Sequence, residues 1–462
     1  MESLPYPSFV SQVPVDASQN RAGLTAVGRC RINPEVASDE YRAIVAKNAE
    51  QAKVDTNSGG GDKDAQKKLK KKYMKEGVAM AKKFLKATLQ LDVSVVEVEI
   101  VVAPKDLVDT DGCLAACLLD AGCQTIVTDG TQLEAMDAAK IPRERLAAHF
   151  TGADNLCQKF EAAAPLASSV SVELDATSSS TLETILSVFE STANVVKEHS
   201  LECVVQIVPS QDESQLESLM SEIHAKAPKG KIALVDPTAR QLGLSYAAYI
   251  RTDREDKLYT TVVCTRNGEA LGLVYSSKES IVASLECARG VYYSRSRNQL
   301  WRKGDTSGHY QTLHRLDIDC DGDAIRFTVT QRGDDKAAFC HLNTLTCWGN
   351  PRGVLHLQET LQDRFKSAPE GSYTKRLFDD PNLLREKLVE EAQELSEATE
   401  KDDVAGELAD VMYFAMVRAV AAGVTFDDAI AELDSRSRKV TRRQGDSKAY
   451  RTEVANKILE GK

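Results

Sequence analysis

Three cysteines in the second half of the chain have the spacing of candidate metal ligands. Cys320 lies inside "DIDCDGDAIRF" (residues 317–327), and Cys340 and Cys347 bound the stretch "CHLNTLTC". Three thiolates with an open fourth position are the ligand set of a catalytic zinc site, whereas a structural site usually closes with a fourth Cys or His. The missing fourth ligand therefore indicates a catalytic site. The alternative reading is that of buried thiols beside a solvated acidic turn.

Three aspartates surround the first of these cysteines. Asp319, Asp321 and Asp323 recur with a period of two, so on a strand they would share one face, opposite Cys320. Carboxylates crowded on one face repel unless they are solvated or bind a hard divalent cation, which prefers oxygen ligands. We expect such a strand to present sulfur to a soft metal and oxygen to a hard one.

A basic and hydroxyl-rich segment precedes the aspartates. The string "SRSRNQLWRKGDTSGHYQ" covers residues 294–311 and suits a substrate that carries phosphate. Its candidate binding residues are Arg295, Arg297, Trp301, Arg302, Lys303, Thr306, Ser307 and His309.

A second acidic group lies near the C-terminus. "KLVEEAQELSEA" supplies Glu390, Glu391 and Glu394, and "GELADVMYF" supplies Glu407 and Asp410. On helices these residues are one-turn neighbours. We expect residues 395–406 to reverse the chain and oppose the two acidic faces, and we expect no lysine at four-residue spacing on that face. This arrangement predicts a divalent-metal site, and the alternative is a solvated helix face.

The elements that must position these residues fall into three regions. Between residues 94 and 236, β-rich runs such as "SVVEVEIVVA" and "KIALVD" alternate with helical stretches, which predicts a mostly parallel α/β sheet or a degenerate barrel over residues 1–240. An Asn-Gly turn at 267–268 predicts a hairpin within a central α+β domain, residues 245–360. Apolar residues at spacings of three and four predict an all-α domain over 370–462. The Gly-rich stretch near 57–62 predicts a surface insertion that leads into a helix over 69–90.

Composition excludes several classes of protein. The 462 residues carry 58 basic and 69 acidic side chains, a net charge of -11, which argues against a general grip on nucleic acid or anionic membrane. We find no signal-like N-terminus and no apolar run near the ~20 residues of a membrane span. Eleven cysteines in such a chain predict reduced thiols and a cytoplasmic location. Cys113, Cys117 and Cys123 lie among leucines and are predicted core thiols.

The motifs "YYSRSRNQLWRKGDTSGHYQ", "DCDGDA" and "FCHLNTLTC" occur in the order seen in phosphoribosyl-AMP cyclohydrolases, which the chain resembles over roughly residues 245–350. The resemblance implies a zinc-activated water that opens the purine ring of phosphoribosyl-AMP beside N1. It assigns zinc to Cys320, Cys340 and Cys347, completed across a dimer interface, and magnesium to the three aspartates. His309 and His341 become candidates for proton transfer. Asp305 replaces the usual Glu, and Leu342-Asn343 replaces the usual Thr-Gly.

The acidic helix pair resembles phosphoribosyl-ATP pyrophosphohydrolases over about residues 370–450. The resemblance implies a magnesium site at Glu390, Glu391, Glu394, Glu407 and Asp410, a catalytic role for Glu391, and release of pyrophosphate from phosphoribosyl-ATP. A nucleic-acid patch is the alternative reading of the basic C-terminal residues. Phosphate contacts would come from Lys375, Arg376, Arg436, Arg438, Arg442 and Arg443.

The two resemblances support each other, because the product of the second reaction is the substrate of the first. Together they resemble the histidine-biosynthesis proteins of fungi, which continue into a histidinol dehydrogenase region, whereas this sequence stops at Lys462, so that activity is not assigned. We expect a homodimeric bifunctional hydrolase, with neither nucleic acid nor membrane as a partner. For residues 1–240 we predict a role in dimerisation or regulation. The alternatives are a general nucleotide pyrophosphohydrolase fused to a structural zinc module, and a non-catalytic scaffold.

Overall fold

The computed structural model describes residues 10–13, 26, 29–32, 39–56, 63–89, 97–174, 182–227, 231–333, 337–349 and 351–441. Its contacts divide the chain into two compact units, which are Met1–Trp348 with Ser435–Thr441, and Gly349–Asp434 with Arg442–Lys462. The predicted boundary between residues 240 and 245 falls inside the first unit and stays a prediction. The predicted Gly-rich insertion at 57–62 lies outside the described residues.

The first unit begins with a parallel barrel. Eight strands pair in chain order, and β1 also pairs with β8, which closes the sheet. The β-rich runs of the sequence analysis all form strands of this barrel, as predicted. The strands are β1 (Val10–Val13), β2 (Arg29–Ile32), β3 (Glu97–Val101), β4 (Thr125–Asp129), β5 (Leu146–Thr151), β6 (Ser169–Glu173), β7 (Glu202–Ile207) and β8 (Lys231–Val235).

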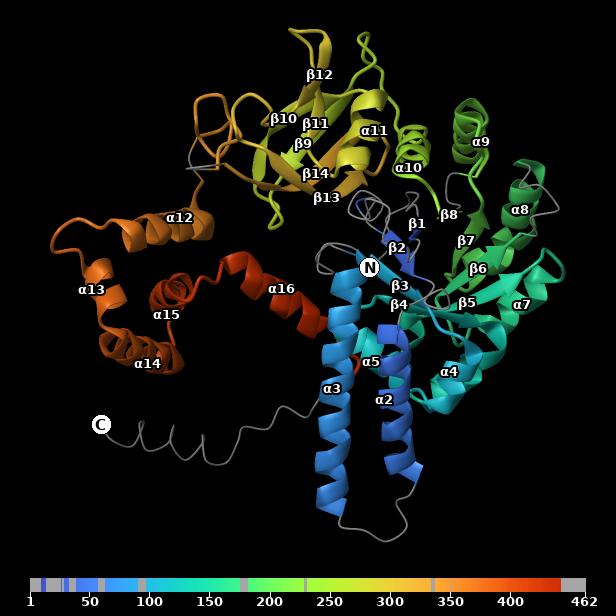
Figure 1. Ribbon diagram of the computed structural model, residues 1–462, viewed down its shortest axis with the longest axis horizontal. Helices are drawn as coiled ribbons and strands as arrows, with labels where there is room; N and C mark the ends of the chain where they lie inside the picture. The colour runs from blue at the N-terminus through green and yellow to red at the C-terminus, as the bar shows by residue number, and fades with distance from the viewer. Residues whose placement is uncertain are drawn as a thin grey trace. The chain divides into compact units, whose positions relative to one another are not determined.

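Helices follow most of these strands (Figure 1). Strand β6, "SVSVE", shows how the sequence builds this layer: Val170 and Val172 are fully buried, and they alternate with Ser171, whose hydroxyl contacts Arg31 of β2 inside the barrel. Of the predicted core thiols, Cys117 and Cys123 are fully buried, whereas Cys113, the first residue of α5, is only partly buried. The helices are α4 (Pro104–Asp109), α5 (Cys113–Ala121), η2 (Gly130–Gln132), α6 (Leu133–Ala138), η3 (Arg143–Arg145), α7 (Leu156–Ala163), α8 (Leu182–Glu198), α9 (Glu213–Lys226) and α10 (Ala239–Ala247).

Two long helices interrupt the barrel between β2 and β3. Helices α2 (Asp39–Thr56) and α3 (Lys63–Leu89) lie side by side (Figure 1). The predicted helix over 69–90 is therefore confirmed, and it begins six residues earlier than expected.

The central part of the first unit is a four-stranded sheet in the order β10-β9-β14-β13, with a separate β11-β12 hairpin. The predicted Asn-Gly hairpin is confirmed, because β9 and β10 pair antiparallel and Gly268 adopts a φ of 84°. The elements are β9 (Tyr259–Cys264), β10 (Ala270–Ser276), α11 (Lys278–Cys287), β11 (Val291–Ser294), β12 (Gln299–Arg302), β13 (Gln311–Ile318) and β14 (Ala324–Gln331).

The second unit is helical, as predicted. Its core contains Leu361, Leu377, Leu384, Phe414 and Val417. The reversal between α14 and α15 is shorter than expected, because only residues 398–400 separate the helices and Gly406 lies within α15. Thr425 caps α16 by accepting a hydrogen bond from the Asp428 N–H. The helices are α12 (Gly353–Lys366), α13 (Tyr373–Asp379), α14 (Pro381–Glu397), α15 (Lys401–Ala421) and α16 (Phe426–Ser437).

Within the described residues, no single helix has the length and apolar composition of a membrane span. Helices α15 and α16 together pass that test only as a pair bent by 105°.

Candidate metal centres and substrate site

The facing helices α14 and α15 bring three glutamates together. Carboxylate oxygens of Glu391, Glu394 and Glu407 lie within 4.8 Å of one another, so side chains from the two helices share one small volume. Glu391 is buried at 6% exposure, whereas Glu394 is exposed. The predicted members Glu390 and Asp410 lie on the same helices but outside this closest group.

The electrostatics of this group fit a cation. Burial raises the pKa of Glu407, and the negative charges of Glu394, Glu391 and Asp410 raise it further. Its buried Oε2 atom has no hydrogen-bond partner within the described part of the chain. A divalent cation among these oxygens would satisfy that atom and offset the repulsion.

A lysine on α14 corrects one expectation from the sequence. Lys387 Nζ lies 2.9 Å from Glu390 Oε2 and 2.9 Å from Glu391 Oε1, so the acidic face does carry a matched lysine at four-residue spacing. Both glutamates raise the pKa of Lys387, chiefly through hydrogen bonds. Lys387 thereby orients Glu391 within the group. The sequence contains this pairing as the string KxxEE, in which the lysine precedes the second glutamate by four residues.

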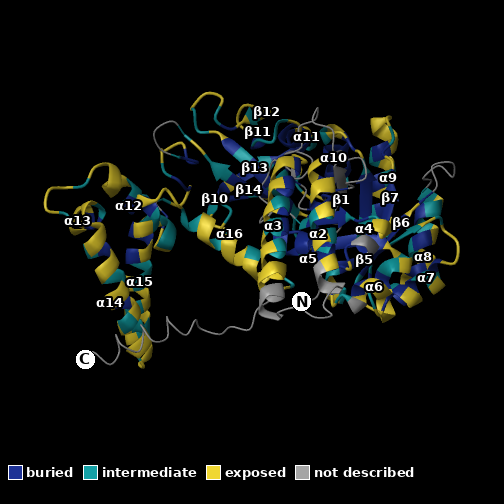
Figure 2. Ribbon diagram, turned by 60° about the horizontal axis from the view of Figure 1, so that its bottom comes forward, coloured by how far each residue is buried: buried dark blue, intermediate teal, exposed yellow. Residues whose placement is uncertain are grey.

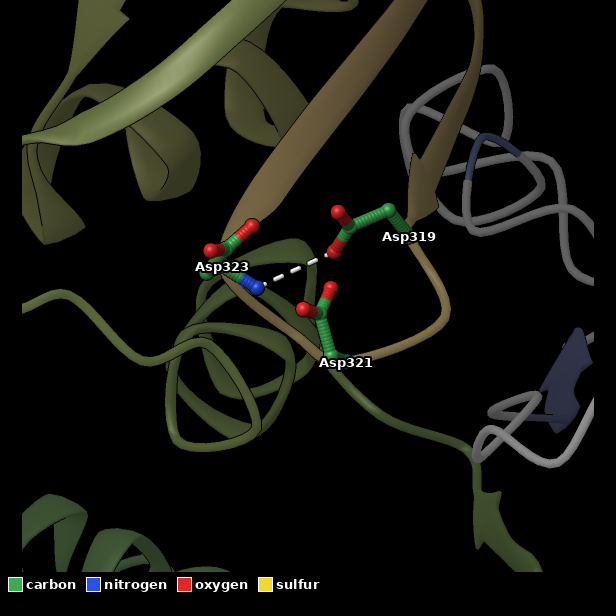
Figure 3. A group of neighbouring side chains, drawn as sticks. All are labelled: Asp319, Asp321 and Asp323. Atoms are coloured by element: carbon green, nitrogen blue, oxygen red, sulfur yellow. Dashed lines mark hydrogen bonds between the residues drawn. The ribbon is translucent and has the colours of Figure 1, made fainter.

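The three aspartates gather in a turn (Figure 3), with oxygens within 4.8 Å of one another. The expected strand with a shared face is wrong, because residues 319–323 connect β13 to β14. Asp319 Oδ1 accepts hydrogen bonds from the N–H groups of Gly322, Asp323 and Ala324, each at 3.0 Å, and Gly322 adopts a φ of 82°. The aspartates therefore converge through a side-chain-capped turn rather than through strand alternation.

The charges in this turn also repel one another. Asp321 and then Asp319 raise the pKa of Asp323. Arg251, which the sequence analysis did not single out, supports the turn by donating its backbone N–H to the Gly322 carbonyl at 2.7 Å and its Nη2 to the Asp321 carbonyl. No local motif identifies Arg251, because it lies about seventy residues before the turn it holds.

Two of the three predicted zinc ligands meet. Cys340 and Cys347 are close enough for a thiol hydrogen bond, and the Cys347 sulfur packs against Gly272 of β10. The Leu342 N–H lowers the pKa of Cys340, whereas burial raises that of Cys347. Cys320 is exposed and does not join a group of three ligands among the described residues. A single chain thus brings two sulfurs together and leaves the third apart.

A buried cation lies beside the two sulfurs. Lys303 is 4% exposed, and its Nζ lies 5.3 Å from the centre of the Phe339 ring and 5.7 Å from that of Trp301. Burial lowers the pKa of Lys303, and the charges of Cys347 and Cys340 oppose that effect. The predicted substrate residues Lys303 and Trp301 therefore border the thiol pair.

Among the remaining predicted residues, His341 lies beside the thiol pair. His341 Nδ1 lies 3.8 Å from Cys340 Sγ, and the buried Nδ1 of His309 has no hydrogen-bond partner among the described residues. Arg295 stacks 3.9 Å from the centre of the Tyr275 ring, and Arg297 donates to Ser294 in the β11-β12 turn. Thr306 and Ser307 are exposed in the loop after β12.

The predicted phosphate contacts of the C-terminal region belong to both compact units. Lys375 pairs with Asp379 at 2.6 Å within α13. Arg436 and Arg438 belong to the segment 435–441, which packs with the first unit. Arg442 and Arg443 lie outside the described residues, and their role stays a prediction.

Comparison with known proteins bears on both regions. The family model of phosphoribosyl-AMP cyclohydrolase matches residues 272–349, and that of phosphoribosyl-ATP pyrophosphohydrolase matches residues 354–437. The chain therefore has the tandem arrangement of a bifunctional hydrolase, with one carboxylate group in each matched region.

Relatives narrow this class, and the chain spans between a quarter and nearly all of the length of the three described next. The histidine biosynthesis bifunctional protein HisIE of Thermus thermophilus is 31% identical over 204 residues, which cover 41% of this chain and 92% of that protein. The bifunctional protein his7 of Schizosaccharomyces pombe is 49% identical, covering 51% of this chain and 58% of his7. A trifunctional protein of Kluyveromyces lactis is 54% identical, covering 43% of this chain and 25% of its own length. The chain belongs to the family of histidine biosynthesis bifunctional proteins.

Proposed function

We propose that the chain hydrolyses phosphoribosyl-ATP to phosphoribosyl-AMP and pyrophosphate, and then opens the purine ring of phosphoribosyl-AMP. The proposal rests on the agreement between the positions of the candidate metal-binding groups and the regions matched by the two families. The glutamate group lies inside the region matched by the pyrophosphohydrolase family, and the aspartate turn and thiol pair lie inside the region matched by the cyclohydrolase family.

For the first step, Glu391, Glu394 and Glu407 would hold magnesium, with Glu390 and Asp410 beside them. The cation would neutralise the developing charge of the triphosphate. Glu391 is assigned to accept the proton of the attacking water, because Lys387 orients its carboxylate toward the group. The water forms a bond to phosphorus, and pyrophosphate leaves with the electron pair of the broken P–O bond.

For the second step, Cys340 and Cys347 would hold zinc and the aspartate turn would hold magnesium. Zinc lowers the pKa of a bound water to about 7 and so supplies a nucleophile at neutral pH. His341, beside Cys340, and His309, with its unpaired Nδ1, are assigned to proton transfer. The substrate phosphate and ribose would contact side chains of the basic segment, which are Arg295, Arg297, Trp301, Lys303, Thr306 and Ser307.

A homodimer would complete the zinc site. Cys320 does not reach the thiol pair of its own chain, so we assign the third sulfur to a second copy. Several apolar side chains of the helical unit support self-association, because Val389 on α14 and Leu408 on α15 are almost half exposed and Leu433 on α16 is 58% exposed. Figure 2 shows exposed stretches on α14 and α16. The cytoplasmic location stays a prediction.

The test follows the ultraviolet spectrum of phosphoribosyl-ATP with the purified chain, magnesium and zinc. Wild type should form the ring-opened product, Cys340→Ala should stop at phosphoribosyl-AMP, and Glu391→Gln should leave phosphoribosyl-ATP intact. Cys157→Ala and Glu386→Gln, which alter a thiol and a carboxylate outside both groups, should behave as wild type.

Two results would contradict the proposal. Hydrolysis of ordinary nucleoside triphosphates without turnover of phosphoribosyl-AMP would favour a general pyrophosphohydrolase with a structural zinc module. A purified chain that binds no zinc and turns over neither phosphoribosyl compound would favour a scaffold.

A further inference from the structure

The interior of the parallel barrel contains charged residues where branched apolar side chains usually pack. At the amino-terminal ends of β2, β7 and β8, the Glu202 carboxylate accepts hydrogen bonds from Arg29 and from Lys231. Strands β2 and β7 are not neighbours in the sheet, so the contact between Arg29 and Glu202 crosses the barrel interior.

The polar contacts continue through the middle of the barrel. Glu99 on β3 accepts from Arg29 Nε at 2.7 Å and from Arg31 Nε at 2.8 Å. Arg31 is fully buried, and its Nη1 donates to Ser171 on β6 at 2.8 Å, again across the interior. Taking these charges out of water is costly unless they are paired, and apolar residues of similar volume often serve stability as well. Stability of the barrel alone therefore does not explain why charged residues occupy its interior.

These polar side chains form a column across the barrel interior, made of Arg29, Arg31, Glu99, Ser171 and Glu202. The column ends in a different set of side chains. Gln206 on β7 donates to Ser171 Oγ at 3.0 Å, and its Nε2 lies 3.4 Å from His149 Nδ1 on β5. His149 Nε2 in turn lies 3.3 Å from Glu173 Oε2. With Nδ1 accepting from the amide, Nε2 carries the proton that points to Glu173.

This set lies at the carboxyl-terminal end of the barrel. Glu173 is the last residue of β6, and Asp129, in register with His149, is the last residue of β4. Exposure of the side chains rises along the column from 0% at Arg31 to 22% at His149 and 55% at Glu173. Barrels of parallel strands bind their ligands at this end, because the loops that follow the strands surround it.

One Arg31 nitrogen lies in an ion pair without an aligned hydrogen bond, so a proton on it can be donated to a second acceptor. Arg31 Nη2 is buried 2.8 Å from Glu99 Oε2, yet it makes no aligned hydrogen bond to any described residue. We propose that the carboxyl-terminal mouth of the barrel binds a small organic anion through its phosphate or carboxylate group, which accepts hydrogen bonds from Arg31 and from His149, whose imidazole ring Gln206 orients. Neither matched family region includes these residues, so neither family match accounts for this site.

The same surroundings disfavour a cation. No carboxylate or imidazole of the mouth belongs to a potential metal-binding group among the described residues, and Arg31 places a permanent positive charge beside the imidazole. Burial and Arg31 lower the pKa of His149, while Glu173 opposes them. An anion would favour the protonated imidazole, and His149 could then donate from both ring nitrogens.

The test reads the histidine itself, because phosphate could also bind the basic cyclohydrolase segment. The full-length chain is labelled with ¹³C at the histidine Cε1 position, and His149→Ala assigns the relevant NMR signal. Inorganic phosphate and acetate are titrated separately. We expect one of the two to shift the His149 signal saturably, and the one that does so defines the acid group. Gln206→Met should weaken that binding at least about tenfold. Gln158→Met, on the exposed surface of α7, should not change it.

The proposal is overturned if neither anion shifts the His149 signal saturably, or if Gln206→Met binds as tightly as wild type. Loss of binding in Gln158→Met would also contradict it. These outcomes are independent of the two hydrolytic activities, which can be measured on the same samples.

Discussion

At the scale of single residues, both candidate magnesium sites consist of clustered carboxylates that repel one another. Glu407 carries this signature through its raised pKa and its unpaired, buried Oε2. Asp323 carries it through the two aspartates beside it. In each case a bound cation would remove the repulsion, so metal binding and local stability should be linked.

Glu407→Gln tests this link in the helical unit. Removing the charge relieves repulsion, so thermal unfolding of the metal-free variant should occur at a higher temperature than in wild type. Magnesium affinity should fall at least about tenfold, because a ligand is lost. Calorimetry with and without magnesium measures both effects. Glu386→Gln, on the exposed side of α14, is the control; a lower unfolding temperature or unchanged magnesium affinity in Glu407→Gln would refute the assignment.

The barrel interior predicts a distinct acid sensitivity. Arg29 and Lys231 lower the pKa of Glu202 from 4.5 to about 2 against the opposing effect of burial. Because the folded-state pKa is depressed, the stabilisation is present above pH 4.5 and is lost as the pH falls toward 2. Linkage gives a loss of about 3 kcal/mol over this window. Hydrogen exchange of peptides from β7 at a series of pH values measures it.

Glu202→Gln should flatten that pH dependence while it lowers stability at pH 7, because Arg29 and Lys231 lose their partner. The matched control is Glu222→Gln, which removes an exposed carboxylate paired with Lys226 and should keep the wild-type profile. An unchanged acid profile in Glu202→Gln would show that other groups govern the transition.

At the scale of elements, turns determine where the functional groups meet. The β13-β14 turn brings the aspartates together because Asp319 accepts three backbone hydrogen bonds, and the short 398–400 turn opposes α14 and α15. The periodicity of the sequence predicted the helices and strands around both turns. It missed the geometry of residues 319–323, because alternation was extended into a segment where Gly322 adopts a positive φ and the strand has ended.

Asp319→Ala should therefore act on stability as well as on metal binding. It leaves three N–H groups without their acceptor, and we expect a loss of about 1–3 kcal/mol in the free energy of unfolding. Asp319→Asn retains an acceptor oxygen and should lose less, while Asp321→Ala, whose carboxylate caps no N–H of the turn, should lose least. Urea denaturation gives the ranking. Equal losses in all three variants would mean that Asp319 does not organise the turn.

At the scale of the whole molecule, contacts within a single chain do not decide whether the protein self-associates. Only two of the three predicted zinc ligands meet in one chain, and the helical hairpin keeps apolar residues exposed. A second copy would account for both observations. The proposed dimer would complete the site, and it can be tested by mixing inactive chains.

Co-expression of Cys320→Ala with Cys340→Ala should restore cyclohydrolase activity. In a mixed dimer, one of the two shared sites contains all three cysteines, so random pairing should give about a quarter of the wild-type activity. Cys340→Ala mixed with Cys347→Ala is the control and should stay inactive, because these ligands come from the same chain. Absence of activity in the first mixture would place all three ligands within one subunit.

The sequence by itself determined most of the kinds of element and the choice of candidate ligand residues, because periodicity and ligand type are local properties. It made the approach of Cys340 to Cys347 and of the two acidic helices predictable, since each set is joined by a short connection, and their roles stay predictions. Only the tertiary structure decided that Cys320 lies apart from the other thiols and that a charged column crosses the barrel. Those features depend on side-chain directions and on closure of the sheet, which bring together residues separated by up to 173 positions, as in the pair Arg29 and Glu202.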